Sequence, residues 1–267
     1  MKPYSEAEYA AQASLVPVTI CVPVYNGEPY LRECLDSIAA QTFRDFIVLV
    51  IDNASTDGTA ALCASYDDAR FFYLRNEINI GSGPNHNRAL DLARSEFVKL
   101  FSADDVLFPD TLALQVSALQ RHPNASLVTS DCIVTGPKLE PLKEARYLAG
   151  PLTGDEAVQS CVRLIDNKIG GPSNTLLRRS AVGAQRIDTS YKWLADLEFH
   201  CRVLTHGDYL NTGKPGFYYR RHSATDSEVG CPPDIRERDE LAFIQQYARS
   251  PMPRLRFEAR RLKRRFA

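Results

Sequence analysis

The amino-acid sequence predicts an α/β protein with a Rossmann-like, mostly parallel β-sheet flanked by helices. Short runs rich in Val, Ile and Phe alternate with amphipathic stretches from residue 18 to residue 130. This alternation is typical of parallel sheets that helices cover on both sides. A chain of 267 residues, 44% hydrophobic and 24% charged, is long enough to bury a sizeable core. We therefore expect a regular first half and a second half continuous with it.

Apolar runs and helical spacing predict the individual elements. Strands are expected at 18–24, 46–51, 71–74 and 97–101. The run at 46–51 is unbroken, as in strands buried on both faces. Helices are expected at 29–38, 56–65, 85–93 and 109–120. In the second half we expect helices at 153–165 and 196–205 and short strands at 174–177 and 216–219.

Composition narrows the class and location of the protein. The formal net charge of −1 gives no overall attraction to nucleic acid, so no nucleic-acid partner is expected. The seven cysteines include no CxxC pair, and reduced thiols are the simplest interpretation. No apolar run approaches the roughly 18 residues of a membrane span, and residues 1–16 do not resemble a secretory leader. A cytoplasmic protein is therefore expected.

Polar residues follow three of the predicted strands at the point where each strand ends. The first strand is followed by Tyr25, Asn26 and Glu28, the second by residues 52–58, and the fourth by residues 102–105. Ligands of open parallel sheets bind beyond the carboxyl ends of the strands, where these loops meet. Each loop alone could be a simple turn or helix cap, but three in register predict a binding site.

The motifs in these loops resemble those of family 2 glycosyltransferases, which are inverting enzymes with the GT-A fold. The resemblance rests on VTICVPVYNGEPYLRECLDSI, VLVIDNASTDGT, NIGSGPNHNRAL and KLFSADDVLFPDTL, in this order. It extends more weakly to DLEFHCRVLTHG and YRRHSATDS. It implies an N-terminal extension at 1–16, a nucleotide-sugar-binding half at 17–131, an acceptor-binding and catalytic half at 132–232, and C-terminal helices at 233–267.

The resemblance also implies a donor site for a nucleotide diphosphate sugar, with UDP favoured over dTDP and GDP. Asp52 would accept a hydrogen bond from the imide N–H of the base, and an aromatic side chain can stack on it. The implied donor-binding residues are Pro23, Tyr25, Glu28, Asp52, Asn79, Gly81, Ala103, Asp104, Arg220 and His222.

A divalent cation, Mn²⁺ or Mg²⁺, is implied on the diphosphate of the donor. Asp104 and His222 are the implied metal ligands, and such a cation bridges phosphates and neutralises their charge. Arg220 and His222 would also stabilise the departing nucleotide. Relatives often carry an Asp-x-Asp motif, whereas this chain has Ser102 in place of the first aspartate. We expect metal use nonetheless, with weaker affinity as a consequence of Ser102, and a metal-free or inactive site is the alternative.

Inversion requires a general base on the face opposite the leaving group. Asp196 matches the aspartate of the family's short acidic motif, although Ala195 replaces the glutamate that usually precedes it. A simple helix cap is the alternative role for Asp196, and Glu198 is the alternative base. On the acceptor side we expect Ser173 and Trp193, the latter as a sugar-stacking platform or as a core residue.

Basic residues dominate segment 254–267, which contains seven Lys or Arg residues and a single glutamate. Leu255, Ala259, Leu262 and Phe266 form one helical stripe. Two interpretations are open: a helix packed on the domain through this stripe, or a peripheral contact with the inner face of an anionic membrane. The second interpretation suits a glycan or lipid-linked acceptor.

The sequence therefore predicts a glycosyltransferase that acts in polysaccharide, glycan or glycolipid synthesis. A nucleotidyltransferase would require a basic, glycine-rich phosphate loop, and residues 22–27 contain no Lys or Arg. A dinucleotide-dependent oxidoreductase would require a third glycine after Gly81 and Gly83. A non-catalytic sugar-nucleotide sensor stays open because of the departures at Ser102 and Ala195.

Overall fold

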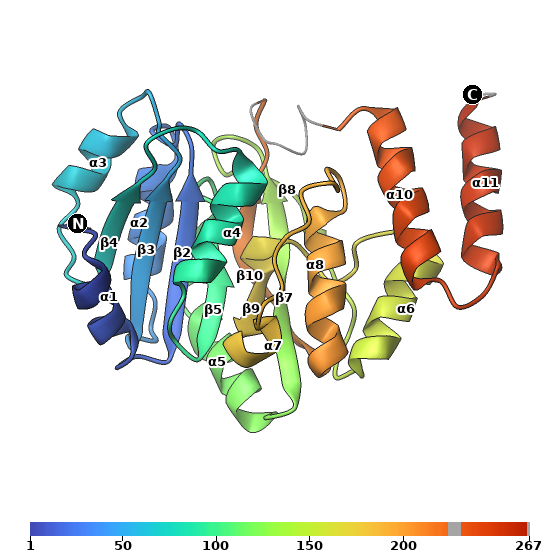
Figure 1. Ribbon diagram of the computed structural model, residues 1–267, viewed down its shortest axis with the longest axis horizontal. Coiled ribbons are helices and arrows are strands. Elements are labelled where there is room, and N and C mark those ends of the chain that lie inside the picture. The colour runs from blue at the N-terminus through green and yellow to red at the C-terminus, as the bar shows by residue number, and fades with distance from the viewer. Residues whose placement is uncertain (224–230, 266–267) are drawn as a thin grey trace.

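A computed structural model shows a ten-stranded mixed sheet flanked by helices (Figure 1). The structure describes residues 1–223 and 231–265, without the side chains of Lys2 and residues 262–265. The strand order is β1-β4-β3-β2-β5-β9-β7-β10-β6, and β8 pairs with β7. This arrangement confirms the predicted α/β class.

Four parallel strands form the first half of the sheet, as the apolar runs predict. They are β2 (Val18–Val24), β3 (Phe46–Asp52), β4 (Phe71–Arg75) and β5 (Phe97–Leu100). The chain runs outward from β2 through β3 to β4 and then crosses to β5, on the other side of β2. Connections on opposite sides of a strand open a crevice at its carboxyl end. The end of β2 is therefore the expected position of the site.

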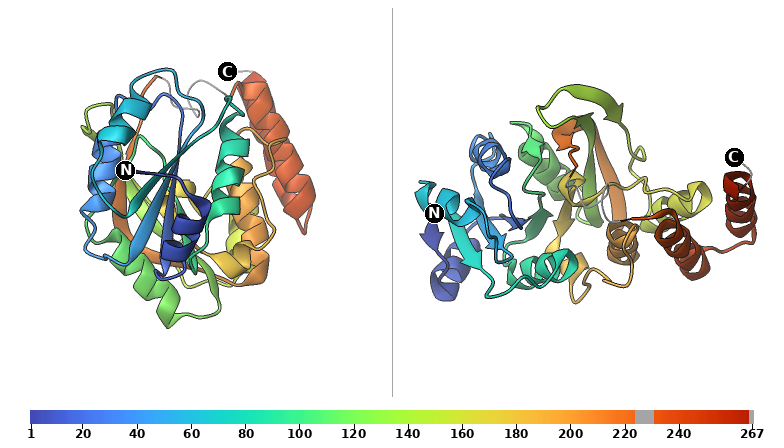
Figure 2. Two further views of the ribbon diagram at one scale, coloured as in Figure 1. Left: turned by 60° about the vertical axis from the view of Figure 1, so that its left-hand side comes forward. Right: turned by 90° about the horizontal axis from the view of Figure 1, so that it is seen from above.

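Two helical layers cover the sheet, and each has its own hydrophobic core. The layer with α2 (Leu31–Ala39) and α5 (Thr111–Arg121) packs on Ile20, Val22 and Val48. The opposite layer contains α1 (Glu6–Ala13), α4 (Ser82–Leu92), α6 (Gly154–Leu164) and α8 (Ala195–Val203). Figure 2 shows the sheet between the two layers. Alternate residues of each strand feed opposite cores, which explains the lack of polar alternation in β2 and β3.

The second half extends the same sheet with strands that the sequence did not predict in full. β9 (Thr175–Arg178) lies antiparallel between β5 and β7 (Ala125–Thr135), and β10 (Asp208–Arg220) runs parallel to β7. Two short strands, β6 (Val106–Leu107) and β8 (Pro141–Ala145), complete the sheet. The predicted boundary at 131/132 falls inside β7. The two predicted halves therefore share one sheet.

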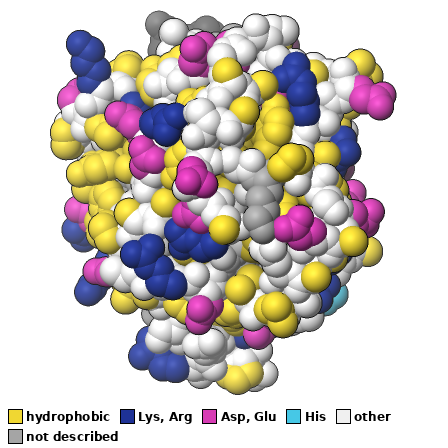
Figure 3. All heavy atoms as spheres, turned by 90° about the vertical axis from the view of Figure 1, so that its left-hand side faces the viewer, with side chains coloured by type: hydrophobic (Ala, Val, Ile, Leu, Met, Phe, Trp, Pro, Cys, Tyr) yellow, Lys and Arg dark blue, Asp and Glu magenta, His cyan; other side chains and the backbone are white. Residues whose placement is uncertain are grey.

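Residues 1–16 join the edge of the sheet. β1 (Lys2–Pro3) pairs with β4, and α1 buries Tyr9 and Ala13. On the molecular face beyond this edge, hydrophobic, basic and acidic side chains are intermixed (Figure 3). The short α3 (Thr59–Ser65) follows β3.

The C-terminal helices pack beyond α6 and α8. They are α10 (Pro233–Tyr247) and α11 (Met252–Arg265), which lie side by side in Figures 1 and 2. The remaining short helices are α7 (Arg179–Val182), η1 (Pro172–Asn174) and η2 (Leu204–His206). In the part of the chain that the structure describes, no helix is long and apolar enough to cross a membrane.

Candidate active site

The loop after β2 is held against the loop after β3 by hydrogen bonds between backbone and side chains. Asn26, with φ of 52°, donates its amide to the Ser55 hydroxyl at 2.9 Å and accepts from the Thr56 amide at 2.9 Å. Glu28 donates its amide to Asp57 at 3.0 Å, and its carboxylate accepts the Gly58 amide at 2.9 Å. The two loops therefore form one hydrogen-bonded wall beside the crevice at the carboxyl end of β2.

The predicted nucleoside-binding residues lie along this wall with different exposure. Tyr25 is 50% exposed, so its ring is available for stacking on a base. Pro23 is buried within β2, and Asp52 is fully buried at the end of β3. Asp52 Oδ2 accepts from the Tyr73 hydroxyl at 2.6 Å and from Arg75 at 2.9 Å, and Oδ1 accepts the Ser55 amide at 2.8 Å. A base contact by Asp52 stays a prediction. The base would have to donate to the second lone pair of Oδ1.

A network of asparagine side chains positions the loop that carries Asn79 and Gly81. Asn53 donates to Asn79 at 2.8 Å and accepts the Ile80 amide at 3.0 Å. Asn76 donates to Asn53 at 2.8 Å and to Asn85 at 3.0 Å. Gly81 has φ of 91°, a conformation that favours glycine. Asn53 and Asn76 were missed from sequence, because an isolated asparagine does not reveal its partner.

The acidic turn after β5, residues 102–105, meets the end of β10. Asp104 Oδ2 lies 3.0 Å from His222 Nε2, although the two residues are 118 positions apart. The Tyr30 ring, in the loop before α2, lies 4.7 Å from the His222 ring. The side chains of Asp104 and His222 are 25% and 14% exposed. The structure therefore brings together the two predicted metal ligands.

A divalent cation fits this pair. Among the described residues no group of three His, Cys, Asp or Glu side chains could hold a metal ion. Mg²⁺ in phosphate-transfer sites is held by one or two carboxylates together with substrate phosphates and water, so a small protein set is compatible. Asp104 and His222 would hold the cation from one side. The neighbouring Asp105 is fully buried, and burial, with Asp104 beside it, raises its pKa well above the usual range.

Arg220 differs from the expectation of a side chain open to the diphosphate. It is 2% exposed, and its Nε donates to the Asp104 carbonyl at 2.8 Å. Its other nitrogens donate to the Pro137 carbonyl at 2.6 Å and to the Glu33 carboxylate, and its guanidinium lies 4.5 Å from the centre of the Tyr30 ring. In this geometry Arg220 holds the end of β10 on the acidic turn, while contact with the donor stays a prediction.

A buried lysine links the acidic turn to the predicted acceptor side. Lys99 on β5 is fully buried, and burial lowers its pKa to about 7. Its Nζ donates to the Ser173 carbonyl at 2.8 Å, the Thr175 carbonyl at 3.2 Å and Gln115 at 3.3 Å. The Ser173 hydroxyl accepts the Ser102 amide at 3.0 Å. Ser173 is therefore a buried link between the two sides of the site.

α8 places Asp196 beside the same turn. A Cβ added to Gly171 would lie 3.7 Å from Asp196 Oδ2. His200, one helical turn further along α8, lies 3.1 Å from the Gly170 carbonyl and 3.4 Å from the Thr175 hydroxyl. Residues four apart share one helix face, so Asp196 and His200 both face the turn at 170–175. Asp196 thus lies near Gly171, and Ser173, two residues after Gly171, accepts the Ser102 amide of the acidic turn.

His200 should make stability depend on pH, because burial lowers its pKa to about 4. The unfolded chain binds a proton near pH 6.5, so stability present at pH 7 is lost as pH falls toward 4. We expect this residue to cost about 2 kcal/mol of the free energy of unfolding between pH 7 and pH 5. Urea titrations of wild type and His200→Gln at both pH values measure it, with the exposed His206→Gln as the matched control. Equal pH dependence in wild type and His200→Gln would contradict the expectation.

Glu198, the alternative base, has a different set of contacts. It is 2% exposed and pairs with Arg202 at 2.8 Å, and it accepts from the Tyr247 hydroxyl at 3.1 Å. Glu198 therefore joins α8 to α10.

Trp193, predicted on the acceptor side, is 36% exposed, and the Arg236 guanidinium lies 4.1 Å from the centre of its ring. Trp193 therefore lies at the surface rather than in the core.

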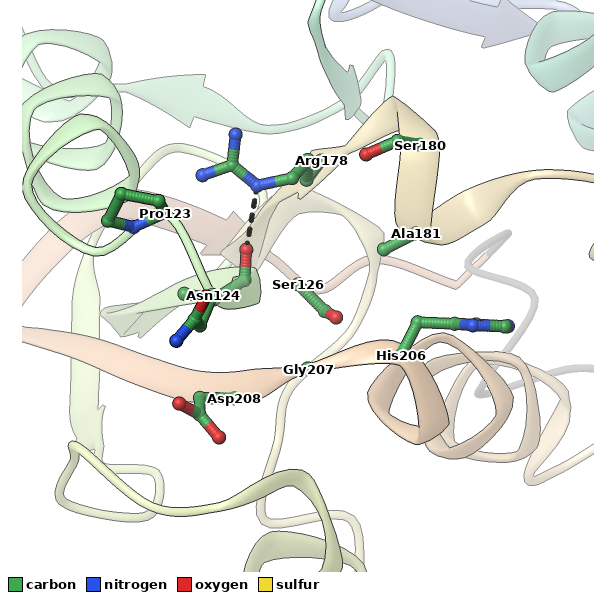
Figure 4. A pocket seen from close by; sticks show the side chains of 10 residues that line it. Pro123, Asn124, Ser126, Arg178, Ser180, Ala181, His206, Gly207 and Asp208 are labelled. Carbon is green, nitrogen blue, oxygen red and sulfur yellow. Dashed lines mark hydrogen bonds between the residues drawn. The ribbon is translucent and has the colours of Figure 1, made fainter.

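A cavity lies away from this site. It has a volume of about 490 Å³, and its lining includes Asn124, Ser126, His206 and Asp208 (Figure 4). Asp208 begins β10 and pairs with Ala125, the first residue of β7. The cavity therefore lies at the amino ends of these parallel strands, opposite the crevice described above.

A mostly parallel α/β sheet with an acidic turn at the carboxyl end of β5 has the architecture of the GT-A class. The chain belongs to glycosyltransferase family 2, because the profile of "Glycosyl transferase family 2" matches residues 19–184, more than half of its length.

Relatives and solved structures agree with this membership. A glycosyltransferase of Methanocaldococcus jannaschii, described as uncharacterised, is 31% identical over 42% of this chain and 40% of its own length. The glycosyltransferase GlyA of Streptococcus pneumoniae is 36% identical over 35% of this chain and 14% of its own length. S. aureus TarS 1–349, solved in complex with UDP-GlcNAc, superposes on 88% of this chain and 68% of its own, with a TM-score of 0.69 and 20% identity. The similarity to TarS shows the GT-A fold, and these two curated relatives are matched over less than half of their length.

Proposed function

We propose that the protein is an inverting transferase that moves a sugar from UDP to a hydroxyl of a glycan or lipid-linked acceptor. The observation that carries this proposal is the placement of two acidic groups, far apart in the sequence, on either side of one hydrogen-bonded link. Asp104 lies with His222 on one side of the Ser102–Ser173 link, and Asp196 lies beside Gly171 on the other. Asp104, with His222, would hold the cation on the diphosphate, and Asp196 would face the acceptor.

On the donor side, Tyr25 would stack on the base while the loop carrying Asn79 and Gly81 would line the donor. The bound cation, Mn²⁺ or Mg²⁺, would neutralise the charge that develops on the diphosphate. Asp104 and His222 would hold it there. UDP is favoured because TarS, which shares the fold, was solved with UDP-GlcNAc, and because a carboxylate such as Asp52 suits an imide N–H.

On the acceptor side, Asp196 would act as the general base. The acceptor oxygen forms a bond to the anomeric carbon while the bond from that carbon to the diphosphate oxygen breaks. The acceptor proton passes to the Asp196 carboxylate, and the nucleoside diphosphate leaves with the bonding electrons. Trp193, exposed two residues before the start of α8, would contact the acceptor sugar.

Nucleotide release tests the proposal directly. The donors are UDP-, dTDP- and GDP-sugars, each offered with and without Mn²⁺, first to water and then with candidate glycan acceptors. We expect slow metal-dependent release from one UDP-sugar and faster release with the right acceptor. Binding of donors without any release would favour a sugar-nucleotide sensor instead, and no binding would contradict both.

We also propose a peripheral contact between α11 and the inner face of an anionic membrane. The helix packs on the domain through Phe257, which is 4% exposed and contacts Ile165 and Ile244. The stripe predicted to pack on the domain does not do so in its described part, because Leu255 is 56% exposed and Ala259 is exposed. An outward apolar stripe among arginines is typical of helices that lie on anionic lipid. A cytoplasmic location is supported by seven cysteines without disulfides, six of them buried.

Removing residues 254–267 should abolish sedimentation with anionic vesicles. Each basic residue near such a surface contributes about 1 kcal/mol, so the loss of seven should remove binding. Vesicles of phosphatidylglycerol and phosphatidylcholine measure it, with pure phosphatidylcholine as the lipid control. Wild type that stays in the supernatant with both lipids would contradict the proposal, as would a truncated chain that still sediments.

A further inference from the structure

The start of α8 lacks a cap from its own sequence. Its N-cap residue, Leu194, has no side-chain oxygen, and the helix begins one residue before Asp196. The first amides of a helix have no partner within the helix and need one elsewhere. In most helices a Ser, Thr, Asp or Asn at the N-cap supplies it.

A carboxylate from α10 instead holds the three residues that lead into α8, across 45 residues of sequence. Asp239 is 1% exposed, and its Oδ2 accepts the amides of Lys192 at 2.6 Å, Trp193 at 2.6 Å and Leu194 at 3.4 Å. Its Oδ1 accepts two hydrogen bonds from Arg238, at 2.9 and 3.2 Å. A buried anion at a helix N-terminus is also favoured by the helix dipole.

Further contacts join the same two segments. Arg238 donates to the Ser190 carbonyl at 3.1 Å, and Tyr191 donates its hydroxyl to Gln246 at 3.1 Å. One turn into α8, Glu198 accepts from the Tyr247 hydroxyl at 3.1 Å. The face of α10 that carries these residues therefore holds segment 190–198 on both sides of Asp196.

We infer that Asp239 is a positioning residue for the general base Asp196. This inference rests on the proposed function of Asp196 and adds the group that fixes it. His200 anchors α8 on the turn at 170–175, and Asp239 holds the segment that leads into the helix. Together these contacts would fix the place of Asp196, which lies between them in the sequence.

Catalytic geometry is sensitive to small displacements, and a misplacement of about 1 Å can cost about 100-fold in rate. Replacing Asp239 with alanine should therefore lower turnover by about 10-fold to 100-fold. Affinity for UDP and Mn²⁺ should stay unchanged, because Asp104 and His222 lie on another part of the sheet. Amide exchange at 192–198 should become about 10-fold faster, since the amides of 192–194 lose their acceptor and the turn that follows them loses its support.

The experiment compares wild type, Asp239→Ala, Asp196→Asn and the double variant. Nucleotide release is measured with the UDP-sugar that wild type hydrolyses, UDP affinity by calorimetry with Mn²⁺, and amide exchange by mass spectrometry. Asp234→Ala, an exposed acidic residue at the start of α10, is the matched control.

A residue that acts through Asp196 should have little further effect once Asp196 is replaced. We expect the double variant to release nucleotide within about 2-fold of Asp196→Asn. Losses that multiply, a weaker affinity for UDP, or unchanged exchange at 192–198 would each overturn the inference. If Asp196→Asn alone releases nucleotide at the wild-type rate, the proposed base is wrong. Faster exchange in Asp239→Ala would still show that Asp239 holds the start of α8.

Discussion

Replacing Asp104 with asparagine should lower metal-dependent nucleotide release by about 10²-fold to 10³-fold. A catalytic cation contributes several kcal/mol of charge stabilisation, and each 1.4 kcal/mol is about tenfold in rate. Asparagine keeps the shape of the side chain and removes the negative charge that holds the cation. The fold should survive, because the Asp104 side chain is 25% exposed and the contact between its carbonyl and Arg220 does not depend on the carboxylate.

The measurement is nucleotide release at increasing Mn²⁺, with wild type and Asp104→Asn side by side. Asp110→Asn is the matched control, because this exposed aspartate lies six residues further along and its side chain accepts from the Thr42 hydroxyl at 3.0 Å, away from His222. We expect release by the control to follow wild type. Equal release by wild type and Asp104→Asn at every Mn²⁺ concentration would show that the acidic turn does not hold the cation.

The strands that form the site were predictable because they are apolar without interruption. β2 and β3 are buried at every position, and their sequences contain few polar residues. β7 is also buried along most of its length, yet it contains Thr129, Ser130 and Asp131. Their partners, which include Ile169, Gln115 and Asn211, come from distant parts of the chain. A polar residue with a distant partner looks like a loop residue in the sequence, so β7 was missed.

The candidate site was predictable where a motif marks it and not where packing makes it. Asp104 and His222 were expected together from resemblance, and the structure places them 3.0 Å apart. Tyr30 falls within the helix predicted at 29–38 and was not singled out, although its ring contacts both Arg220 and His222. Aromatic residues next to a phosphate-binding loop are the available signal, but nothing in the sequence says which ring meets which cation.

Arg220 illustrates why exposure cannot be inferred from a motif. The segment with Arg220 and His222 suggested two donors open to a diphosphate, whereas Arg220, the last residue of β10, is 2% exposed. Its guanidinium is held by Glu33, Tyr30 and the Asp104 carbonyl, and His222 lies against the Asp104 carboxylate. Arg220 therefore has a structural role here, and His222 stays the predicted metal ligand.

Replacing Asp196 with asparagine should lower transfer to the acceptor by about 10²-fold to 10⁴-fold, the usual contribution of a general base. The amide cannot take the acceptor proton, yet it has almost the same volume, so α8 should keep its place against Gly171.

Affinity for the UDP-sugar and Mn²⁺ should stay within about 2-fold of wild type, since the donor groups lie on the other side of Ser173. The measurements are acceptor-dependent nucleotide release and calorimetry with UDP. Glu198→Gln separates the two candidate bases, because Glu198 joins α8 to α10 and its loss should lower the melting temperature more than the rate. A rate that falls in Glu198→Gln and not in Asp196→Asn would transfer the role of base to Glu198. A fall in both donor affinity and rate in Asp196→Asn would instead make Asp196 part of the donor site.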